Sequence, residues 1–156
     1  MVDQFRGFGS LKTPQDQLAK VQRTLARLQG RPTDSDIASD FFINANNLVD
    51  WVYPGKPKPA ARKTLEQEPL LELVSHIANR SKHWVVTHSV HRSFKDAETR
   101  PPVYDADVFD PAVYQTEPEL VVLLKEPTAG YRDEIRVLDL AADVVAWWEN
   151  WFVSNP

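Results

Sequence analysis

Apolar side chains recur at helical spacing in four segments of the chain, the first two of which lie near its start. The first segment follows Thr13 and Pro14, which suit a helix N-cap and first turn, and Gly30 ends it. The second segment begins at Thr33 and is interrupted by Tyr53-Pro54-Gly55. Each helix carries its apolar positions on one face. These positions are Leu18, Val21, Leu25 and Leu28 in the first, and Ile37, Phe41, Ala45, Leu48, Val49 and Val52 in the second.

The third helical segment runs from about Leu65 or Pro69 to about Lys82. Its spacing gives one face toward the core and an opposite, polar face. We expect inward side chains at Leu70, Leu73, Val74, Ile77, Ser81 and Trp84, and outward ones at Glu72, His76, Asn79 and His83.

The last helical segment has an unusually wide apolar face. Asp139 can cap it, and it extends to about Phe152. Its apolar positions cover more than a third of the circumference, so the helix is either central in the fold or shared with a partner. They are Leu140, Ala141, Val144, Val145, Trp147, Trp148, Trp151 and Phe152.

Between the third and last helices the pattern changes to extended chain. The apolar run at residues 119–125 predicts a strand, the turn residues 127–130 follow it, and residues 134–137 predict its antiparallel partner. Residues 84–90 are valine-rich and can add a further strand. Residues 93–118 combine acids with four prolines, which predicts a long, partly mobile loop.

These elements predict one α+β domain, mostly α, over residues 1–156. Four principal helices form a bundle-like core, and a small antiparallel hairpin or sheet is inserted before the last helix. The length suits a single core, and 42% hydrophobic residues with five tryptophans can fill it. The absence of cysteine excludes disulfides, thiolate zinc ligands and a cysteine nucleophile.

Charge and hydropathy limit the partners. The net charge of −4 and a pI near 5.5 argue against whole-surface attraction to nucleic acid. Basic residues gather locally, at residues 56–63 and again at residues 80–95. There is no apolar run of signal-peptide or membrane-spanning length, so we expect a soluble, cytoplasmic protein with no membrane association.

All four histidines lie within the stretch HIANRSKHWVVTHSVH, residues 76–91. His76 and His83 share a helix face but lie two turns, about 10 Å, apart, which is too far for one metal ion. His88 and His91 fall in the extended segment, where their side chains point to opposite sides. We therefore expect hydrogen-bonded or solvated histidines, with no metal and no cofactor.

Asn79 and Arg80 beside His83 place a phosphate-binding cation next to a titrating imidazole. This group loosely resembles the motif of HEPN-type ribonucleases, small dimeric helical bundles with an arginine, four to six residues and then a histidine. From Arg80, His83 is too near and His88 is one residue too far. The resemblance implies an alternative function: an RNA-binding or RNA-cleaving toxin or defence protein, acting as a metal-independent endoribonuclease.

A polar edge of the second helix carries further candidate binding residues, Asp40, Asn44 and Asn47. Asparagine is a poor helix former, so its repeated use indicates side chains bonded to another group. One interpretation is a structural tie to Asn79 or Ser81 of the third helix. The other is acid–base chemistry or magnesium binding by the carboxylates Asp36 and Asp40, although no Glu-x-x-His or Asp-x-Asp pattern supports it.

Residues 40–51, DFFINANNLVDW, and residues 76–83, HIANRSKH, resemble two helices of a group of small uncharacterised bacterial or phage proteins. The resemblance implies that the polar faces of these helices belong to one site, and it transfers no catalytic residue.

The aromatic residues of the last helix support our main prediction, a non-enzymatic interaction protein. Trp148 is expected in the core, whereas Trp147 and Trp151 are candidates for an interface. Nucleic-acid stacking is disfavoured because residues 139–152 contain no arginine or lysine. The expected partner is another protein or a second copy of the chain.

Overall fold

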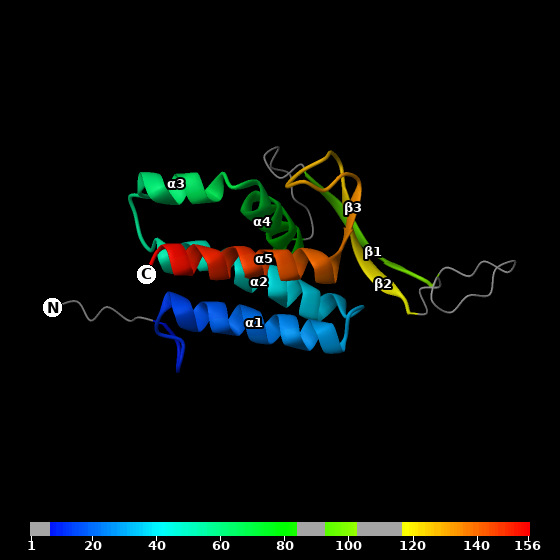
Figure 1. The fold of residues 1–156 in the computed structure, drawn as a ribbon, viewed down its shortest axis with the longest axis horizontal. Coiled ribbons are helices and arrows are strands. Elements are labelled where there is room, and N and C mark those ends of the chain that lie inside the picture. Colours follow the sequence, from blue (N-terminus) through cyan, green and yellow to red (C-terminus); the bar gives the residue numbers. More distant parts are fainter. Residues whose placement is uncertain (1–6, 84–92, 103–116) are drawn as a thin grey trace, which may run out of the picture.

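A computed structural model describes residues 7–83, 93–102 and 117–156. These residues form five helices and a three-stranded antiparallel sheet (Figure 1), so the fold is α+β and mostly α, as predicted. In chain order the elements are α1 (Pro14–Gly30), α2 (Ser35–Val52), α3 (Ala60–Glu66), α4 (Pro69–Lys82), β1 (Phe94–Arg100), β2 (Glu119–Leu124), β3 (Glu134–Arg136) and α5 (Val137–Ser154).

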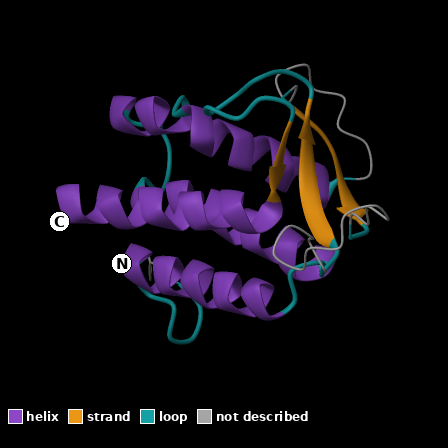
Figure 2. Ribbon diagram, turned by 45° about the vertical axis from the view of Figure 1, so that its right-hand side comes forward, coloured by secondary structure: helices purple, strands orange, loops and turns teal. Residues whose placement is uncertain are grey.

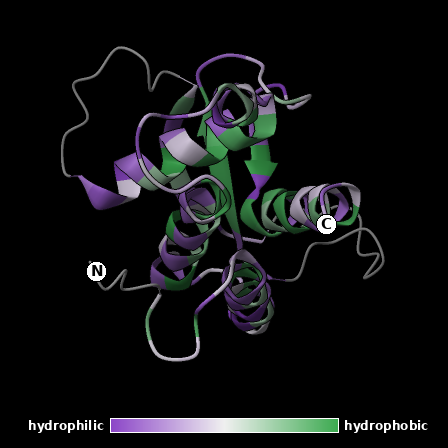
Figure 3. Cartoon of the chain, turned by 90° about the vertical axis from the view of Figure 1, so that its left-hand side faces the viewer, coloured by the Kyte–Doolittle hydropathy of each residue, from purple (hydrophilic) through white to green (hydrophobic). Residues whose placement is uncertain are grey.

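Helices α1, α2 and α5 pack against one another, and α4 packs on α2. The sheet lies at one end of the helices (Figures 1 and 2), where β1 contacts α4 while β2 and β3 contact α5. The start of α1 and the end of α5 lie at the opposite end (Figure 1). Viewed along the helices, the hydrophobic segments gather in the middle of the molecule (Figure 3).

The start of α1 is confirmed, whereas α2 begins at Ser35, two residues after the predicted start at Thr33. The Asp16 N–H donates to Thr13 Oγ1 at 3.1 Å, and the Thr13 N–H donates back to Asp16 Oδ2 at 2.9 Å. The cap of α2 is Asp34, not Thr33. Its carboxylate accepts the N–H groups of Asp36 and Ile37, each at 3.0 Å, which satisfies two of the orphan donors at the helix start.

The third predicted helix is α4, which begins at Pro69, the later of the two predicted starts, and ends at Lys82 as predicted. Helix α3, which ends at Glu66, was not predicted. Proline suits the first turn of α4 but cannot continue α3, since it has no N–H to donate. Ser81 was predicted to point inward and is exposed, whereas Leu71 is buried. Trp84 lies outside the described residues.

The last helix begins earlier than predicted. Its N-cap is Arg136, so α5 follows β3 directly, and Asp139 lies in the first turn instead of capping it. The Arg136 Nε donates to Asp139 Oδ2 at 2.6 Å. Val137 is buried, and the drive to bury it favours a helix start before the acidic residue.

The predicted β2–β3 hairpin is present, with Val122 opposite Ile135. Its other neighbour is β1, with Ala97 opposite Val122, so part of the loop predicted over residues 93–118 is a strand. Five consecutive residues of β1, Lys95 to Thr99, are exposed, and the sequence therefore lacked the apolar alternation that marks a half-buried strand. The other possible strand, 84–90, lies outside the described residues, as do residues 103–116.

Candidate functional site

A cleft of about 410 Å³ lies between α2, α3 and α4. Its walls include buried apolar side chains, Val49 and Leu71, together with polar and charged groups from all three helices. The polar and charged residues are Asn46, Asp50, Lys58, Arg62, Glu66, Glu72, Ser75 and His76.

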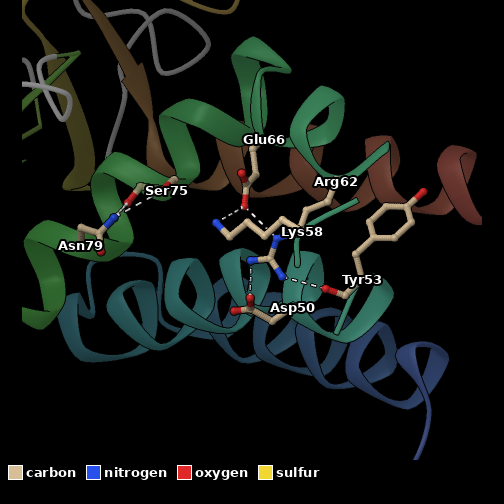
Figure 4. A network of polar contacts seen from close by, with 7 residues as sticks. All are labelled: Asp50, Tyr53, Lys58, Arg62, Glu66, Ser75 and Asn79. Atoms are coloured by element: carbon tan, nitrogen blue, oxygen red, sulfur yellow. Dashed lines mark hydrogen bonds and ion pairs between the residues drawn. The ribbon is translucent and has the colours of Figure 1, made fainter. Parts of the chain in front are cut away.

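Arg62 is the centre of the cleft's polar network (Figure 4), and its side chain is only 10% exposed. Its guanidinium donates to Asp50 Oδ1 at 2.5 Å, to Glu66 Oε1 at 2.9 Å and to the Tyr53 carbonyl at 2.7 Å. Lys58 Nζ adds a bond to Glu66 Oε1 at 3.0 Å. Arg62 therefore joins the end of α2 to α3, and its charge is matched by two carboxylates.

The network also decides the charge of Glu66. Burial alone would raise the pKa of the Glu66 carboxyl, but hydrogen bonds from Arg62 and Lys58 outweigh burial and leave its pKa lowered. Glu66 is therefore held ionised. Because the Arg62 guanidinium is already bonded to Asp50, Glu66 and the Tyr53 carbonyl, we interpret the network as a clamp that joins α2 to α3.

His76 lies in the interior, which corrects its predicted place on the solvent face of α4. Its Nδ1 bonds to the hydroxyl of Ser93, which directly precedes β1, and its Nε2 lies 3.9 Å from Glu72 Oε1. The start of β1 covers this side of α4, so a position that is polar by helical spacing is buried by a later segment. His76 connects the cleft with the sheet.

The predicted catalytic group is divided. The Asn79 amide donates to the Ser75 carbonyl of its own helix at 2.9 Å (Figure 4). Arg80 and His83 are exposed and line an open depression of about 460 Å³ at the end of α4 with Ser81 and Lys82. Arg80 and His83 thus lie close together, whereas Asn79 is bonded elsewhere. His88 and His91 lie outside the described residues.

The predicted polar edge of α2 also lies mostly outside the cleft. Asp40 is exposed, and the Asn44 amide donates to the Asp40 carbonyl of its own helix at 2.7 Å. The tie to another helix comes from Gln17 of α1, whose amide donates to the Asn44 carbonyl at 3.0 Å, and not from Asn79 or Ser81. Asn47 is partly buried and does not line the cleft.

The polar faces of α2 and α4 do meet in the cleft, but α2 contributes Asn46 and Asp50. The sequence interpretation missed these residues and also Arg62. The available signal was the pair Arg62 and Glu66, four residues apart, which suits an ion pair on a helix. The neighbouring lysines obscured this signal, because Arg62 then resembles one of several solvated cations at residues 56–63.

Aromatic rings cluster toward the C-terminal end of α5. Trp148 is completely buried, and its ring centroid lies 5.2 Å from that of Trp147 and 5.7 Å from that of Trp151. Tyr53, just after α2, lies 6.4 Å from Trp151, edge to face. Trp147, Trp151 and Phe152 are each partly exposed, and Val153 is 82% exposed. The core thus absorbs Trp148 but leaves an aromatic surface beside it.

The charged residues of α5 are all acidic: Asp139, Asp143 and Glu149. Asp139 pairs with Arg136, whereas the other two have uncharged partners. The Tyr131 hydroxyl donates to Asp143 Oδ2 at 2.5 Å, and the Gln22 amide donates to Glu149 Oε1 at 2.7 Å. Burial and the bond to Asp143 both raise the pKa of Tyr131, so the phenol stays protonated and acts as the donor in this bond.

Within the described residues, no group of three or more His, Cys, Asp or Glu side chains could hold a metal ion. In the same part of the chain, none of the helices has the length and apolar character needed to cross a membrane. No protein-family model, curated protein or solved structure matches the chain. The functional argument therefore depends on the residues themselves.

Proposed function

We propose that the protein is a small, non-enzymatic interaction protein that works in the cytoplasm and binds another protein through the C-terminal half of α5. We call the binding surface the aromatic face and define it by Trp147 and Trp151, which lie one turn apart on the same side of α5. The partner is a different protein or a second copy of the chain.

The observation that carries the proposal is the partial exposure of these two tryptophans on one side of a continuous helix. Large aromatic side chains are enriched among residues that dominate binding energy, because each removes much apolar surface from water. The arrangement of the cleft supports the absence of catalysis, since Arg62 is committed to Asp50 and Glu66.

Light scattering at several concentrations tests the homodimer form of the proposal. Asn150→Glu places a charge beside the aromatic face without disturbing the core, because Asn150 is exposed and lies three residues after Trp147 on the helix. Phe8→Glu is the matched control, since Phe8 is 86% exposed and lies outside α5. A dimer weakened by Asn150→Glu and not by Phe8→Glu would support self-association. A monomer in all three proteins would eliminate it and leave the heterologous partner.

A second candidate function is RNA binding at the end of α4. Arg80, Lys82 and His83 are exposed around one depression, and neither Arg80 nor Lys82 forms an ion pair with the described residues. The test is a gel-shift and cleavage assay with single-stranded RNA. Retarded or cut RNA, with loss in Arg80→Ala and His83→Ala and not in the surface control Arg23→Ala, would favour it. Intact, unretarded RNA would count against it.

A further inference from the structure

We infer that the partner of the aromatic face is a basic protein segment, and that one of its arginine side chains binds between Trp147 and Asp143. This inference rests on the proposed function and adds the chemistry of the partner.

Helical geometry brings an acid and two rings into line on α5. Asp143, Trp147 and Trp151 follow one another at intervals of four residues, so each lies one turn from the next along the same side of the helix. Asp143 is exposed, and both tryptophans are partly exposed. The stripe therefore places a carboxylate one helical turn from an indole ring on the same side of α5.

This pair of groups suits a guanidinium. An indole face attracts a cation through its quadrupole, and a neighbouring carboxylate can accept a hydrogen bond from the same planar group. Only Oδ2 of Asp143 accepts a hydrogen bond from the described residues, the one donated by Tyr131. The second oxygen, Oδ1, is available to a partner. Because Tyr131 fixes the carboxylate in place, less conformational entropy is lost on binding.

Charge complementarity distinguishes a basic partner from a second copy. Helix α5 has three acids and no basic residue. Two copies packed through this helix about a twofold axis would bring the same acidic surface together, which is unfavourable at an interface. The same negative charge repels a phosphate backbone, so RNA does not fit this surface.

Two designed peptides provide the test. The first is an acetylated amphipathic helix with arginines flanking a leucine stripe, and the second has glutamate at every arginine position. Isothermal titration gives their affinities for the full chain at about 50 mM salt and again at about 500 mM. We expect the arginine peptide to bind about tenfold more tightly at low salt, with most of the difference lost at high salt.

Variants of the chain locate the effect. Asp143→Asn keeps an oxygen for Tyr131 but removes the charge, so it should cost the arginine peptide about three- to fivefold in affinity. Asp36→Asn is the matched control, because it removes one exposed acid from α2 and should leave the affinity ratio unchanged. Trp147→Leu keeps an apolar side chain without a π face and should also reduce the preference for arginine, provided that its thermal melt shows a folded protein.

The outcomes separate this inference from the proposed function. Equal binding of both peptides, weakened by Asn150→Glu, would retain an apolar docking surface and overturn the basic partner. An arginine preference that survives Asp143→Asn, or that Asp36→Asn weakens equally, would also overturn it. If neither peptide binds at millimolar concentration, the inference is contradicted, and the aromatic face is not a docking surface for amphipathic helices of either charge.

Discussion

Arg62 provides the sharpest test of how the helices are held together. Replacing it with methionine keeps most of the apolar stem and removes the guanidinium. Its three hydrogen-bonding partners, Asp50, Glu66 and the Tyr53 carbonyl, then lose their donor at once. The expected result is a less stable protein in which the end of α2 and α3 are no longer joined.

The exposure of the partners sets the size of the effect. Breaking an ion pair between two buried groups costs about 3–5 kcal/mol, and losing an exposed pair costs about 0.2–1 kcal/mol. Arg62 is 10% exposed, but Asp50 is 62% exposed and is rehydrated when the cation is removed. We therefore expect Arg62→Met to lower the free energy of unfolding by about 2 kcal/mol.

Urea unfolding followed by far-UV circular dichroism measures this change. Arg31→Met is the matched control, because Arg31 is 72% exposed and pairs with Asp34 at the surface. It should cost less than about 1 kcal/mol. If Arg62→Met and Arg31→Met differ by less than about 0.5 kcal/mol, the polar network contributes no net stability and the interpretation as a clamp is wrong.

Three further predictions concern the caps and the core. Hydrogen bonds lower the pKa of Asp16 and of Asp34 below the ordinary aspartate pKa of 3.8. Both ionised carboxylates therefore stabilise the fold above pH 3.8, and this stabilisation is lost as the pH falls through their lowered pKa values. An acid titration should show less pH-dependent loss of stability in Asp34→Asn. The Trp148 indole is fully buried, and its N–H has no hydrogen-bond partner among the described residues, so its contribution to stability is packing. In urea unfolding, Trp148→Phe should cost about 1–2 kcal/mol because a ring remains, and Trp148→Ala about 3–5 kcal/mol because a cavity is left. Similar costs for both would contradict a packing role. Ser93→Ala should lower the free energy of unfolding by about 1–2 kcal/mol, since it removes a hydrogen bond from buried His76. Amide hydrogen exchange in β1 should then become faster. Unchanged exchange would refute a tie between α4 and β1.

The helices could be predicted because each has a local signal. The N-cap at Thr13 and the apolar stripe of α1 depend only on neighbouring residues, and both are present as predicted. The errors are also local in origin. Thr33 suits a helix cap as Asp34 does, and Asp139 also suits a cap although α5 continues directly from β3.

Two features of the candidate sites could not be predicted, because they depend on contacts between distant segments. His76 is polar by its place on α4 but is covered by the start of β1. Arg62 reads as a surface cation until α2 supplies Asp50 and the Tyr53 carbonyl. Neither contact leaves a periodic trace in the sequence, since periodicity reports which face of a helix is buried and not what buries a polar residue.

Site-specific photo-crosslinking in the cells that make the protein naturally is the most direct test of the central claim, binding through α5. A benzophenone amino acid replaces Asn150, which is exposed on α5, or Asp36, which is exposed on α2. We predict a protein adduct of defined mass from position 150 only, and its loss when Trp147 is also changed to leucine. Adducts of equal yield from both positions, or an adduct at position 150 unaffected by Trp147→Leu, would contradict the claim.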